Sequence, residues 1–231
     1  MKTIGLLGGM SWESTVPYYR IINQTVKEKL GGLHSAKLFL YSCNFEEIAQ
    51  LQRAGEWDAA AGQLARAAKS MRVAGADFLV VCTNTMHMVA DKIESEADIP
   101  LLHIVEPTAE EIRRSGLKKV GLIATGFTME KDFYKQRMRE RHGIEAIVPN
   151  EADRAVVHKV IYEELCRGIV RDESRDAYRK IIRRLAEQGA EGIILGCTEI
   201  SMLISQEDSP VPVFDTTALH ARKAAEYALE P

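Results

Sequence analysis

The sequence predicts an α/β fold with two similar parallel-sheet domains, and two observations carry this prediction. Short apolar runs alternate with stretches whose apolar residues recur at helical spacing, as between Ala60 and Met71 and between Tyr178 and Leu185. This alternation is typical of parallel sheets covered by helices. The second observation is an internal repeat of strand-like segments. The segments expected to be buried strands are residues 4–7, 38–41, 78–81, 120–123, 193–195 and 211–214.

The repeat consists of three matches that occur in the same order in the two halves of the chain. Their offsets are 114, 116 and 112 residues, and none of the matches needs a gap. Each match alone is weak, because Gly-Ala before an apolar strand is common in α/β proteins. Together they favour a duplicated α/β unit. The matched pairs are residues 75–85 with 189–199, 4–7 with 120–123, and 99–102 with 211–214.

The duplication predicts the domain boundaries and their symmetry. We expect an N-terminal domain of residues 1–98 plus 214–231 and a C-terminal domain of residues 99–213, related by pseudo-twofold symmetry. Ligands of open α/β sheets bind beyond the carboxyl ends of the strands. If two such ends face each other, a small molecule is held in the cleft between the domains, approached by the loops at 83–85 and 197–199.

Composition narrows the class of partner. The 231 residues are 46% hydrophobic and 27% charged with a net charge of −3, which is ordinary for a globular protein and gives no basic surface for nucleic acid. No apolar run approaches the roughly 20 residues of a membrane span. The N-terminus resembles a first strand rather than a signal peptide. Four cysteines without C-x-x-C spacing favour a reduced cytoplasmic protein with neither disulfide scaffold nor zinc site.

Cys197 is the first candidate for chemistry. It follows Gly196 at the end of an expected strand, and Thr198 and Glu199 are suited to a helix start. A cysteine near a helix N-terminus has its thiolate stabilised by backbone N–H groups and the helix dipole, so we expect a lowered thiol pKa. The alternative is that Cys197 is a small buried hydrophobe, as most free cysteines are.

The matching loop holds Thr83, Asn84 and Thr85 at a second expected helix start, where hydroxyls, an amide and backbone N–H groups suit a carboxylate ligand. An ordinary helix cap is the alternative reading. The repeat aligns Thr83 with Cys197, so the two are expected to approach a ligand from opposite sides. Strand alternation should point the neighbouring Cys82 away, into the core.

Cofactor motifs are absent from the sequence. Residues 8–11 are neither G-x-G-x-x-G nor part of a phosphate loop, and a tight turn that brings Met10 to a ligand fits them better. His87, His103 and His220 are isolated from one another, and no H-x-x-x-H or H-E-x-x-H spacing occurs. We therefore expect no metal and no other cofactor.

Three segments resemble the signatures of the aspartate/glutamate racemase family: residues 8–10 after the first strand, residues 83–87, and residues 196–200. The resemblance covers nearly the whole chain and is closest to a bacterial branch with Thr-Asn-Thr in the second segment. It implies an amino-acid racemase that needs no pyridoxal phosphate, metal or nucleotide, and a homodimer. In most members two cysteines work on opposite faces of the substrate Cα, one removing the α-proton and the other returning a proton.

Two departures from the family pattern affect the expected specificity. Thr83 stands where the family has its first cysteine, and a hydroxyl is a poor source of a base at neutral pH. The resemblance assigns the second cysteine, Cys197 here, to the L-face of the substrate and so implies action first on L-amino acids. Gln52 and Cys166 stand where aspartate-selective members have basic residues, although Arg53 and Arg167 are adjacent. The resemblance implies catalytic roles for Cys197 and Thr83 and substrate binding by Met10, Gln52, Asn84, Thr85, Thr125, Cys166, Thr198 and Glu199.

The leading hypothesis is racemisation of L-aspartate or L-glutamate, with wider tolerance. Loss of the first cysteine also suits a single-cysteine decarboxylase or a cis–trans isomerase of a small dicarboxylate on the same fold. A third possibility is an amino-acid-binding protein that has lost catalysis. Retention of Asn84, Thr85, Thr198 and Glu199 favours the amino-acid substrate.

Overall fold

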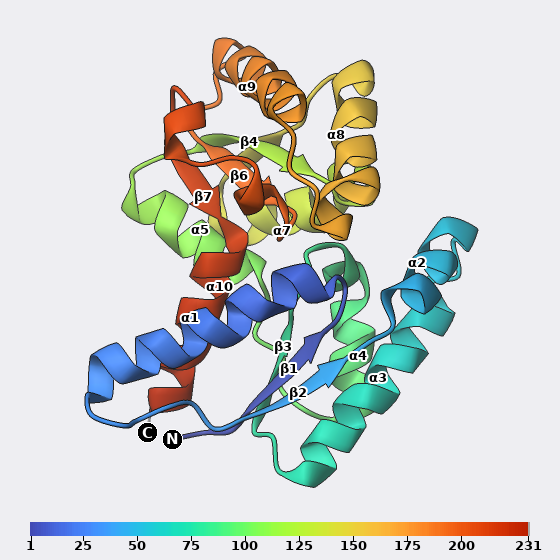
Figure 1. Ribbon diagram of the computed structural model, residues 1–231, viewed down its shortest axis with the longest axis vertical. Helices are drawn as coiled ribbons and strands as arrows, with labels where there is room; N and C mark the ends of the chain where they lie inside the picture. The colour runs from blue at the N-terminus through green and yellow to red at the C-terminus, as the bar shows by residue number, and fades with distance from the viewer. Residues whose placement is uncertain (231) are drawn as a thin grey trace. The chain divides into compact units, whose positions relative to one another are not determined.

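The computed structural model describes residues 1–230 and divides the chain into two compact units (Figure 1). Unit 1 comprises Met1–Ile104 and the C-terminal stretch from His220 onwards, and unit 2 comprises Val105–Leu219. Each unit contains one parallel sheet with helices. The prediction of an α/β fold with two similar parallel-sheet units is confirmed. Whether residues 1–98 with 214–231 and residues 99–213 form separate domains stays a prediction, and Pro231 lies outside the described residues.

Unit 1 is built on a three-stranded sheet of order β2-β1-β3, and both neighbouring pairs are parallel. An isolated parallel bridge from Leu79 to Leu101 extends it beyond β3. The strands are β1 (Ile4–Gly8), β2 (Leu38–Ser42) and β3 (Phe78–Val81); the helices are α1 (Trp12–Leu30), α2 (Phe45–Ala54), α3 (Trp57–Ala74) and α4 (Ala90–Ala97), with a 3-10 helix η1 (Thr85–Val89) before α4.

Two apolar cores lie on the two faces of this sheet, because successive side chains of a strand point to opposite faces. One core joins Leu79 and Val81 of β3 to residues of α3 and α4. The other joins Phe78 and Val80 of β3 to α1 and to α10 (Thr216–Leu229), the helix on which the chain returns to unit 1. Cys82 belongs to the second core and is fully buried, so its expected inward orientation is confirmed.

The strand expected at residues 38–41 is present but is not buried. It forms the edge strand β2, where Phe39, Leu40 and Tyr41 are 38%, 46% and 45% exposed. An apolar run is equally compatible with a buried central strand and with an edge strand, so the run alone could not place it. The exposed apolar side chains leave this edge of unit 1 open to a partner.

Unit 2 is built on a four-stranded parallel sheet of order β5-β4-β6-β7. The short strand β5 was not expected, because its three residues carry no extended apolar run. The strands are β4 (Lys119–Ala124), β5 (Glu145–Ile147), β6 (Ile193–Gly196) and β7 (Val213–Asp215); the helices are α5 (Val105–Arg114), α6 (Gly126–Glu130), α7 (Asp132–His142), α8 (Glu151–Glu163) and α9 (Asp172–Glu187), with 3-10 helices η2 (Leu165–Arg167), η3 (Ile200–Met202) and η4 (Gln206–Asp208).

Strand pairing supports the internal repeat residue by residue. In unit 1 the strand at residues 4–7 pairs in parallel with the strand in residues 75–85, which bridges in parallel to residues 99–102. In unit 2 the strand at residues 120–123 pairs in the same way with the strand in residues 189–199, which pairs in parallel with residues 211–214. The register is the one that the three offsets require, so the matched segments hold equivalent places in the two sheets. The equivalent pairs are Gly5 with Leu79 and Gly121 with Ile193, then Leu79 with Leu101 and Ile193 with Val213.

The helices of unit 2 pack against its sheet and against one another, and α6 contacts α7, α8 and β4. Helices α8 and α9 contact each other and β4, whereas α5 contacts α7 and β7. The apolar stripe expected on α9 is buried, with Tyr178, Ile181, Ile182 and Leu185 each no more than 1% exposed. Within residues 1–230, no helix is long and apolar enough to cross a membrane.

Candidate functional site

In unit 1 the predicted site residues lie near the carboxyl ends of the strands. Met10 follows β1, the run from Thr83 to Thr85 follows β3, and Gln52 lies on α2, the helix after β2. Because the strands are parallel, these ends lie at one edge of the sheet. All five side chains are buried: their exposures are 3% for Met10, 3% for Gln52, 8% for Thr83, 1% for Asn84 and 4% for Thr85.

The turn between β1 and α1 depends on glycine. Gly9 has φ of +83°, and a Cβ atom there would lie 2.3 Å from the backbone nitrogen of Cys43. No other residue fits such an approach of two backbones. The turn is closed by the Gly9 N–H, which donates to Thr15 Oγ1 at 2.9 Å. The tight turn expected here is therefore present, and the Met10 side chain is part of the apolar core of unit 1.

The loop carrying Thr83 is held by short-range hydrogen bonds. The Thr83 N–H donates to the Val81 carbonyl at 2.9 Å, and the His87 N–H donates to the Asn84 carbonyl at 3.1 Å. The His87 ring folds back, with Nδ1 2.7 Å from the Thr83 carbonyl oxygen. The helix expected here begins as the 3-10 helix η1 and becomes α-helical only at Ala90.

Gln52 joins α2 to the same loop. Its Nε2 atom lies 3.1 Å from the sulfur of Met86, which is fully buried within η1. The adjacent Arg53 is committed to a surface ion pair with Glu46 at 2.6 Å. Within unit 1, Gln52 is thus the buried polar side chain of α2, and its neutral amide brings no positive charge.

In unit 2 the predicted residues gather after β6. Gly196 ends that strand, and a Cβ atom there would lie 2.6 Å from Cδ1 of Leu122 on β4. The absence of a side chain allows β4 and β6 to pack closely just before Cys197. Cys197, Thr198 and Glu199 are 7%, 3% and 2% exposed.

The Glu199 carboxylate is the centre of a hydrogen-bonded group. The Cys197 thiol donates to Glu199 Oε2 at 3.0 Å, and the Thr198 hydroxyl donates to the same atom at 2.8 Å. Cys166, on η2, also makes a side-chain hydrogen bond to Glu199. The sequence separates Cys166 from Cys197 by two secondary-structure elements, and the fold brings both thiols to one carboxylate.

The expected lowering of the Cys197 pKa is wrong. Burial raises the pKa of this thiol well above its usual value, and the negative charge of Glu199 raises it further. The helix that was to stabilise a thiolate is only the three-residue η3, too short to supply a substantial dipole. Burial also raises the pKa of Cys166, again with Glu199 as the next contributor. Both residues are thiols in this arrangement.

Tyr178 is a neighbour of this group that sequence reasoning assigned only to the core. Its hydroxyl donates to the Val157 carbonyl at 3.1 Å. Burial raises the pKa of the phenol well above its usual value, and electrostatic interaction with Cys197, Glu164 and Cys166 adds to the effect. The helical apolar pattern correctly predicted burial of Tyr178 but contained nothing to associate it with Cys197.

Thr125 directly follows β4, the strand equivalent to β1, and therefore aligns with Gly9, the neighbour of Met10 in unit 1. It is the N-cap of α6, and its hydroxyl oxygen accepts the Thr128 N–H at 3.3 Å. The next residue, Gly126, donates its N–H to Nδ1 of His158 at 3.0 Å. The structure thus gives Thr125 a capping role at the strand end.

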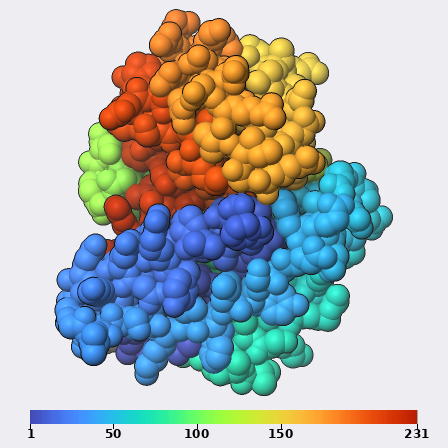
Figure 2. All heavy atoms as spheres, in the orientation of Figure 1, coloured from blue at the N-terminus to red at the C-terminus, as the bar shows by residue number. Residues whose placement is uncertain are grey.

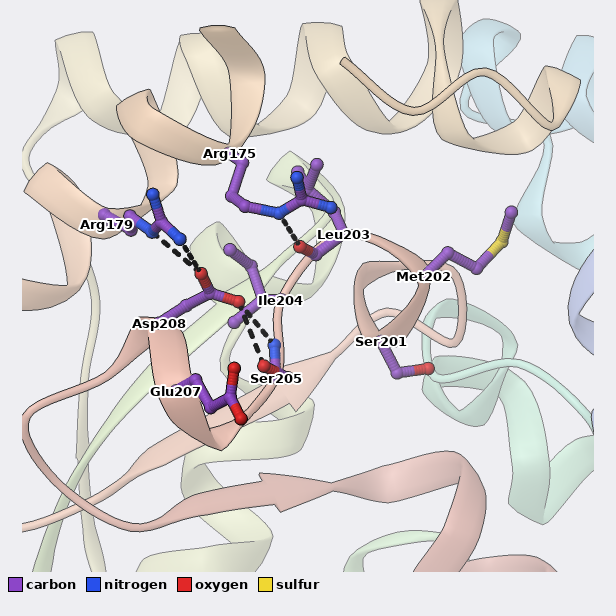
Figure 3. A pocket seen from close by; sticks show the side chains of 9 residues that line it. All are labelled: Arg175, Arg179, Ser201, Met202, Leu203, Ile204, Ser205, Glu207 and Asp208. Atoms are coloured by element: carbon purple, nitrogen blue, oxygen red, sulfur yellow. Dashed lines mark hydrogen bonds and ion pairs between the residues drawn. The ribbon is translucent and has the colours of Figure 1, made fainter. Parts of the chain in front are cut away.

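A pocket of about 320 Å³ lies beyond the Cys197 loop in unit 2 (Figure 3). Its two guanidinium groups are committed: Arg179 binds Asp208 at 2.7 Å, and Arg175 Nε donates to the Leu203 carbonyl at 2.9 Å. None of the predicted site residues lines it. The pocket is lined by Arg175, Arg179, Ser201, Met202, Leu203, Ile204, Ser205, Glu207 and Asp208.

The described residues offer no arrangement of three or more His, Cys, Asp or Glu side chains that could hold a metal ion. The three histidines that the sequence presents as isolated are nevertheless neighbours in unit 1. The ring centroids of His87 and His103 are 4.5 Å apart, and those of His87 and His220 are 5.8 Å apart. Their separation in sequence concealed this cluster.

The class of the protein follows from comparison of its sequence and fold with known proteins, because all three comparisons find racemases. A family model described as Asp/Glu/Hydantoin racemase matches residues 7–224. The broad specificity amino-acid racemase RacX of Bacillus subtilis (strain 168) is 26% identical over 225 residues, which cover 95% of each chain.

Two solved structures match the whole chain. A candidate Asp/Glu racemase from Yersinia pestis is 58% identical with a TM-score of 0.92, and the match covers 100% of both chains. An aspartate racemase homologue from Pyrococcus horikoshii OT3 is 37% identical with a TM-score of 0.84, again over 100% of both chains. The chain belongs to the Asp/Glu/hydantoin racemase family and is an isomerase.

Proposed function

We propose that this protein racemises small amino acids, with L-aspartate and L-glutamate preferred, and that Cys197 carries the proton at Cα. The observation that carries the proposal is the hydrogen bond from the Cys197 thiol to the Glu199 carboxylate, at 3.0 Å. A thiol with a raised pKa is a poor base unless a second group takes its proton. Glu199 is within reach to do so.

The proposed chemistry begins with proton transfer from Cys197 to Glu199, which leaves a thiolate and a carboxylic acid. The thiolate removes the α-proton of an L-amino acid, and the electron pair of the broken C–H bond remains on the substrate as a carbanion. Reprotonation of the opposite face from Thr83 or an adjacent water gives the D-enantiomer. The extra proton on the Cys197–Glu199 pair then goes to solvent, and solvent returns a proton to Thr83 or to the water that gave one up, so the protons balance over the cycle.

Substrate binding is proposed for the polar residues that follow the strands of each unit. Backbone and side-chain donors of Asn84, Thr85 and Thr198 suit the α-carboxylate. Met10 and Thr125 lie shortly after β1 and β4 and are proposed to border the substrate.

Specificity for the side chain is proposed to be loose. Gln52 and Cys166 are both neutral at the positions where the family resemblance implies basic residues. Arg53, next to Gln52, is committed to Glu46 at 2.6 Å. A substrate carboxylate would thus meet hydrogen-bond donors rather than a buried cation, so uncharged side chains should also be accepted. The name of the Bacillus subtilis relative, a broad specificity amino-acid racemase, agrees with this proposal.

We also propose a homodimer, on the resemblance and on the exposed apolar surface of unit 1. Trp12, Val16 and Tyr19 are spaced along one face of α1 and are 61%, 56% and 52% exposed. The chain surface over α1 is visible in Figure 2. Burial of such side chains against a second copy is favourable by about 25 cal/mol per Å² of apolar area. Sedimentation at micromolar concentration should give a dimer, and Val16→Arg should shift it towards monomer.

The cofactor requirement and the location of the protein are further proposals. The sequence carries no nucleotide fingerprint, and the proposed steps use only Cys197, Glu199, Thr83 and water. We therefore propose catalysis without pyridoxal phosphate or metal, in the cytoplasm, with no nucleic-acid partner. Protein dialysed against a chelator and then treated with a carbonyl-trapping reagent should keep its activity. Restoration of lost activity by pyridoxal phosphate or a metal would contradict the cofactor proposal.

The experiment that tests the function is a panel of L- and D-amino acids in D₂O, followed by NMR for loss of the α-proton signal and by chiral chromatography for inversion. L-Aspartate and L-glutamate should exchange fastest. An amino-acid-binding protein without catalysis would exchange none of them. A decarboxylase or dicarboxylate isomerase would instead change its own substrate, such as a malonate or maleate, and leave the amino acids unexchanged.

A further inference from the structure

The buried histidine cluster of unit 1 is hydrogen-bonded to the loop that carries Thr83. His87, His103 and His220 are 4%, 6% and 0% exposed, and they come from three separate parts of the chain. The chain leaves unit 1 after Ile104 and returns to it at His220. Two of the three histidines therefore stand at the points where the chain passes between units, and the third lies on η1 next to Thr83.

The hydrogen bonds of His87 fix its tautomer. Its Nδ1 lies 2.7 Å from the Thr83 carbonyl oxygen, which can only accept, so Nδ1 carries the proton. Its Nε2 lies 3.2 Å from the Ile104 backbone nitrogen, whose N–H can only donate, so Nε2 carries a lone pair. His87 is consequently the neutral Nδ1–H form, and it connects Thr83 to the last residue before the chain leaves unit 1.

His220 makes the corresponding connection from α10. Its Nε2 lies 2.8 Å from the Leu102 carbonyl oxygen and donates a hydrogen bond to it. The other ring nitrogen, Nδ1, therefore accepts a hydrogen bond from the Tyr18 hydroxyl, at 2.9 Å. Leu102 and Ile104 flank His103 in the chain. The backbone on both sides of His103 is thus held by a histidine, one from η1 and one from α10, and His87 is in ring contact with both His103 and His220.

We propose that His87 is a positioning residue for racemisation. It holds the Thr83 backbone to residues 102–104, the segment through which the chain leaves unit 1, and thereby sets the place of the Thr83 hydroxyl. This inference rests on the proposed function, in which Thr83 serves the substrate face opposite Cys197. Proton delivery depends steeply on the distance between donor and acceptor, so a small shift of the Thr83 backbone should slow the return of the proton on that face.

Two substitutions separate the two bonds of His87. The amide nitrogen of His87→Asn lies where Nδ1 was, so this variant can keep the bond to the Thr83 carbonyl and loses the bond to Ile104. The amide of His87→Gln reaches the place of Nε2, so its oxygen can accept from the Ile104 N–H while the bond to Thr83 is lost. Each variant removes the ring, so effects of ring loss are common to both.

The readout is the ratio of racemisation to α-proton exchange for L-glutamate in D₂O. Exchange needs only Cys197 and its proton acceptor Glu199, whereas racemisation also needs the face served by Thr83. We expect His87→Gln to lower this ratio on the order of tenfold, with KM little changed, and His87→Asn to leave it within about twofold of the parent. Equal ratios in the two variants, or losses that merely follow thermal stability, would overturn the proposal.

Two further measurements do not depend on activity. Long-range ¹⁵N–¹H NMR of the full chain at pH 7 should report the Nδ1–H tautomer of His87, and an Nε2–H or doubly protonated ring would overturn the proposal. Amide hydrogen exchange of Ile104 should be faster in His87→Asn than in His87→Gln. A parent that exchanges no α-proton contradicts the proposed function, while these two measurements still decide the bonds of His87. Exposed His34, changed to Asn and Gln, provides the matched control.

Discussion

The Sγ atom of Cys197 lies 3.0 Å from Oε2 of Glu199, and the thiol donates its proton to that carboxylate. The relation has two opposite consequences. In the proposed mechanism the carboxylate accepts the thiol proton. Its charge also raises the pKa of the thiol, although burial contributes most to that rise. A substitution that removes the charge but keeps the shape separates the two effects.

Glu199→Gln should therefore slow catalysis at neutral pH and ease formation of the thiolate. The amide cannot take a proton, so α-proton exchange should fall by about 10- to 100-fold at pH 7. With the Glu199 charge gone, the pKa of Cys197 falls, although burial keeps it above the usual value. Alkylation of Cys197, mapped by mass spectrometry, should then reach a given rate at a lower pH than in the parent.

The control for this experiment is Glu187→Gln, which changes the net charge equally on an exposed part of α9. Its exchange rate and alkylation profile should match those of the parent. Exchange by Glu199→Gln at the parental rate across the pH range would show that the carboxylate does not take the thiol proton.

Cys197→Ala tests the central role of the thiol. Loss of the general base should lower α-proton exchange of L-glutamate by about 10²- to 10⁴-fold, while circular dichroism reports an unchanged fold. The matched control is Cys82→Ala, which removes a fully buried thiol from the apolar core behind Thr83. That control should lose some stability and keep its specific activity. A Cys197→Ala variant as active as the control would leave the proposed mechanism without its base.

The sequence predicted the sheets well because apolar runs are direct evidence of strands. The run at Phe78–Val81 coincides with β3, and the three repeat offsets agree with the pairing of Gly5 with Leu79 and of Gly121 with Ile193. Patterns of this kind depend only on the residues of one segment. The short strand β5 and the exposure of β2 depend on which neighbours each strand finds in the fold, so no local pattern could have given them.

The residues around Cys197 were harder to predict for the same reason. The sequence correctly placed Cys197 at a strand end, but the ionisation of its thiol depends on burial and on Glu199, and both act against the thiolate. Cys166 entered through the resemblance alone, and its hydrogen bond to Glu199 became visible only in three dimensions. His87 lay within a segment of the family resemblance, but nothing linked it to its partners Ile104 and His220, which are distant in the sequence.

Thr83→Cys should make catalysis more symmetric. In the proposed mechanism Cys197 is the base of the parent protein, so L-enantiomers should exchange their α-proton faster than D-enantiomers. A thiol at position 83 supplies a second acid and base, and exchange of D-glutamate should rise about tenfold or more. Initial rates for both enantiomers in D₂O provide the measurement, and the equilibrium between enantiomers must stay unchanged.

Thr83→Ser is the matched control for that substitution, because it keeps a hydroxyl and should remain asymmetric. The one-base picture is mistaken if the parent exchanges both enantiomers at equal initial rates and Thr83→Cys leaves those rates unaltered.

His220 should make the stability of the protein sensitive to mild acid. Burial lowers the pKa of this histidine from 6.5 to about 4, and its two ring nitrogens are engaged by Tyr18 and the Leu102 carbonyl. A folded pKa below the unfolded value means that the unfolded chain binds the proton more tightly. The stabilisation is present above pH 6.5 and is lost as the pH falls towards 4, by on the order of 3 kcal/mol.

His220→Gln tests this prediction, because its amide can still donate to the Leu102 carbonyl but does not titrate. The variant should be less stable than the parent at pH 7.5, since the Tyr18 hydroxyl loses its acceptor. Between pH 6.5 and 4 its free energy of unfolding should nevertheless fall less than that of the parent. The difference between the two falls should be on the order of 3 kcal/mol, measured by urea titrations at successive pH values. The exposed substitution His34→Gln should follow the parent. Parallel pH dependence in His220→Gln and the parent would mean that His220 already binds its proton as readily in the folded chain as in the unfolded one.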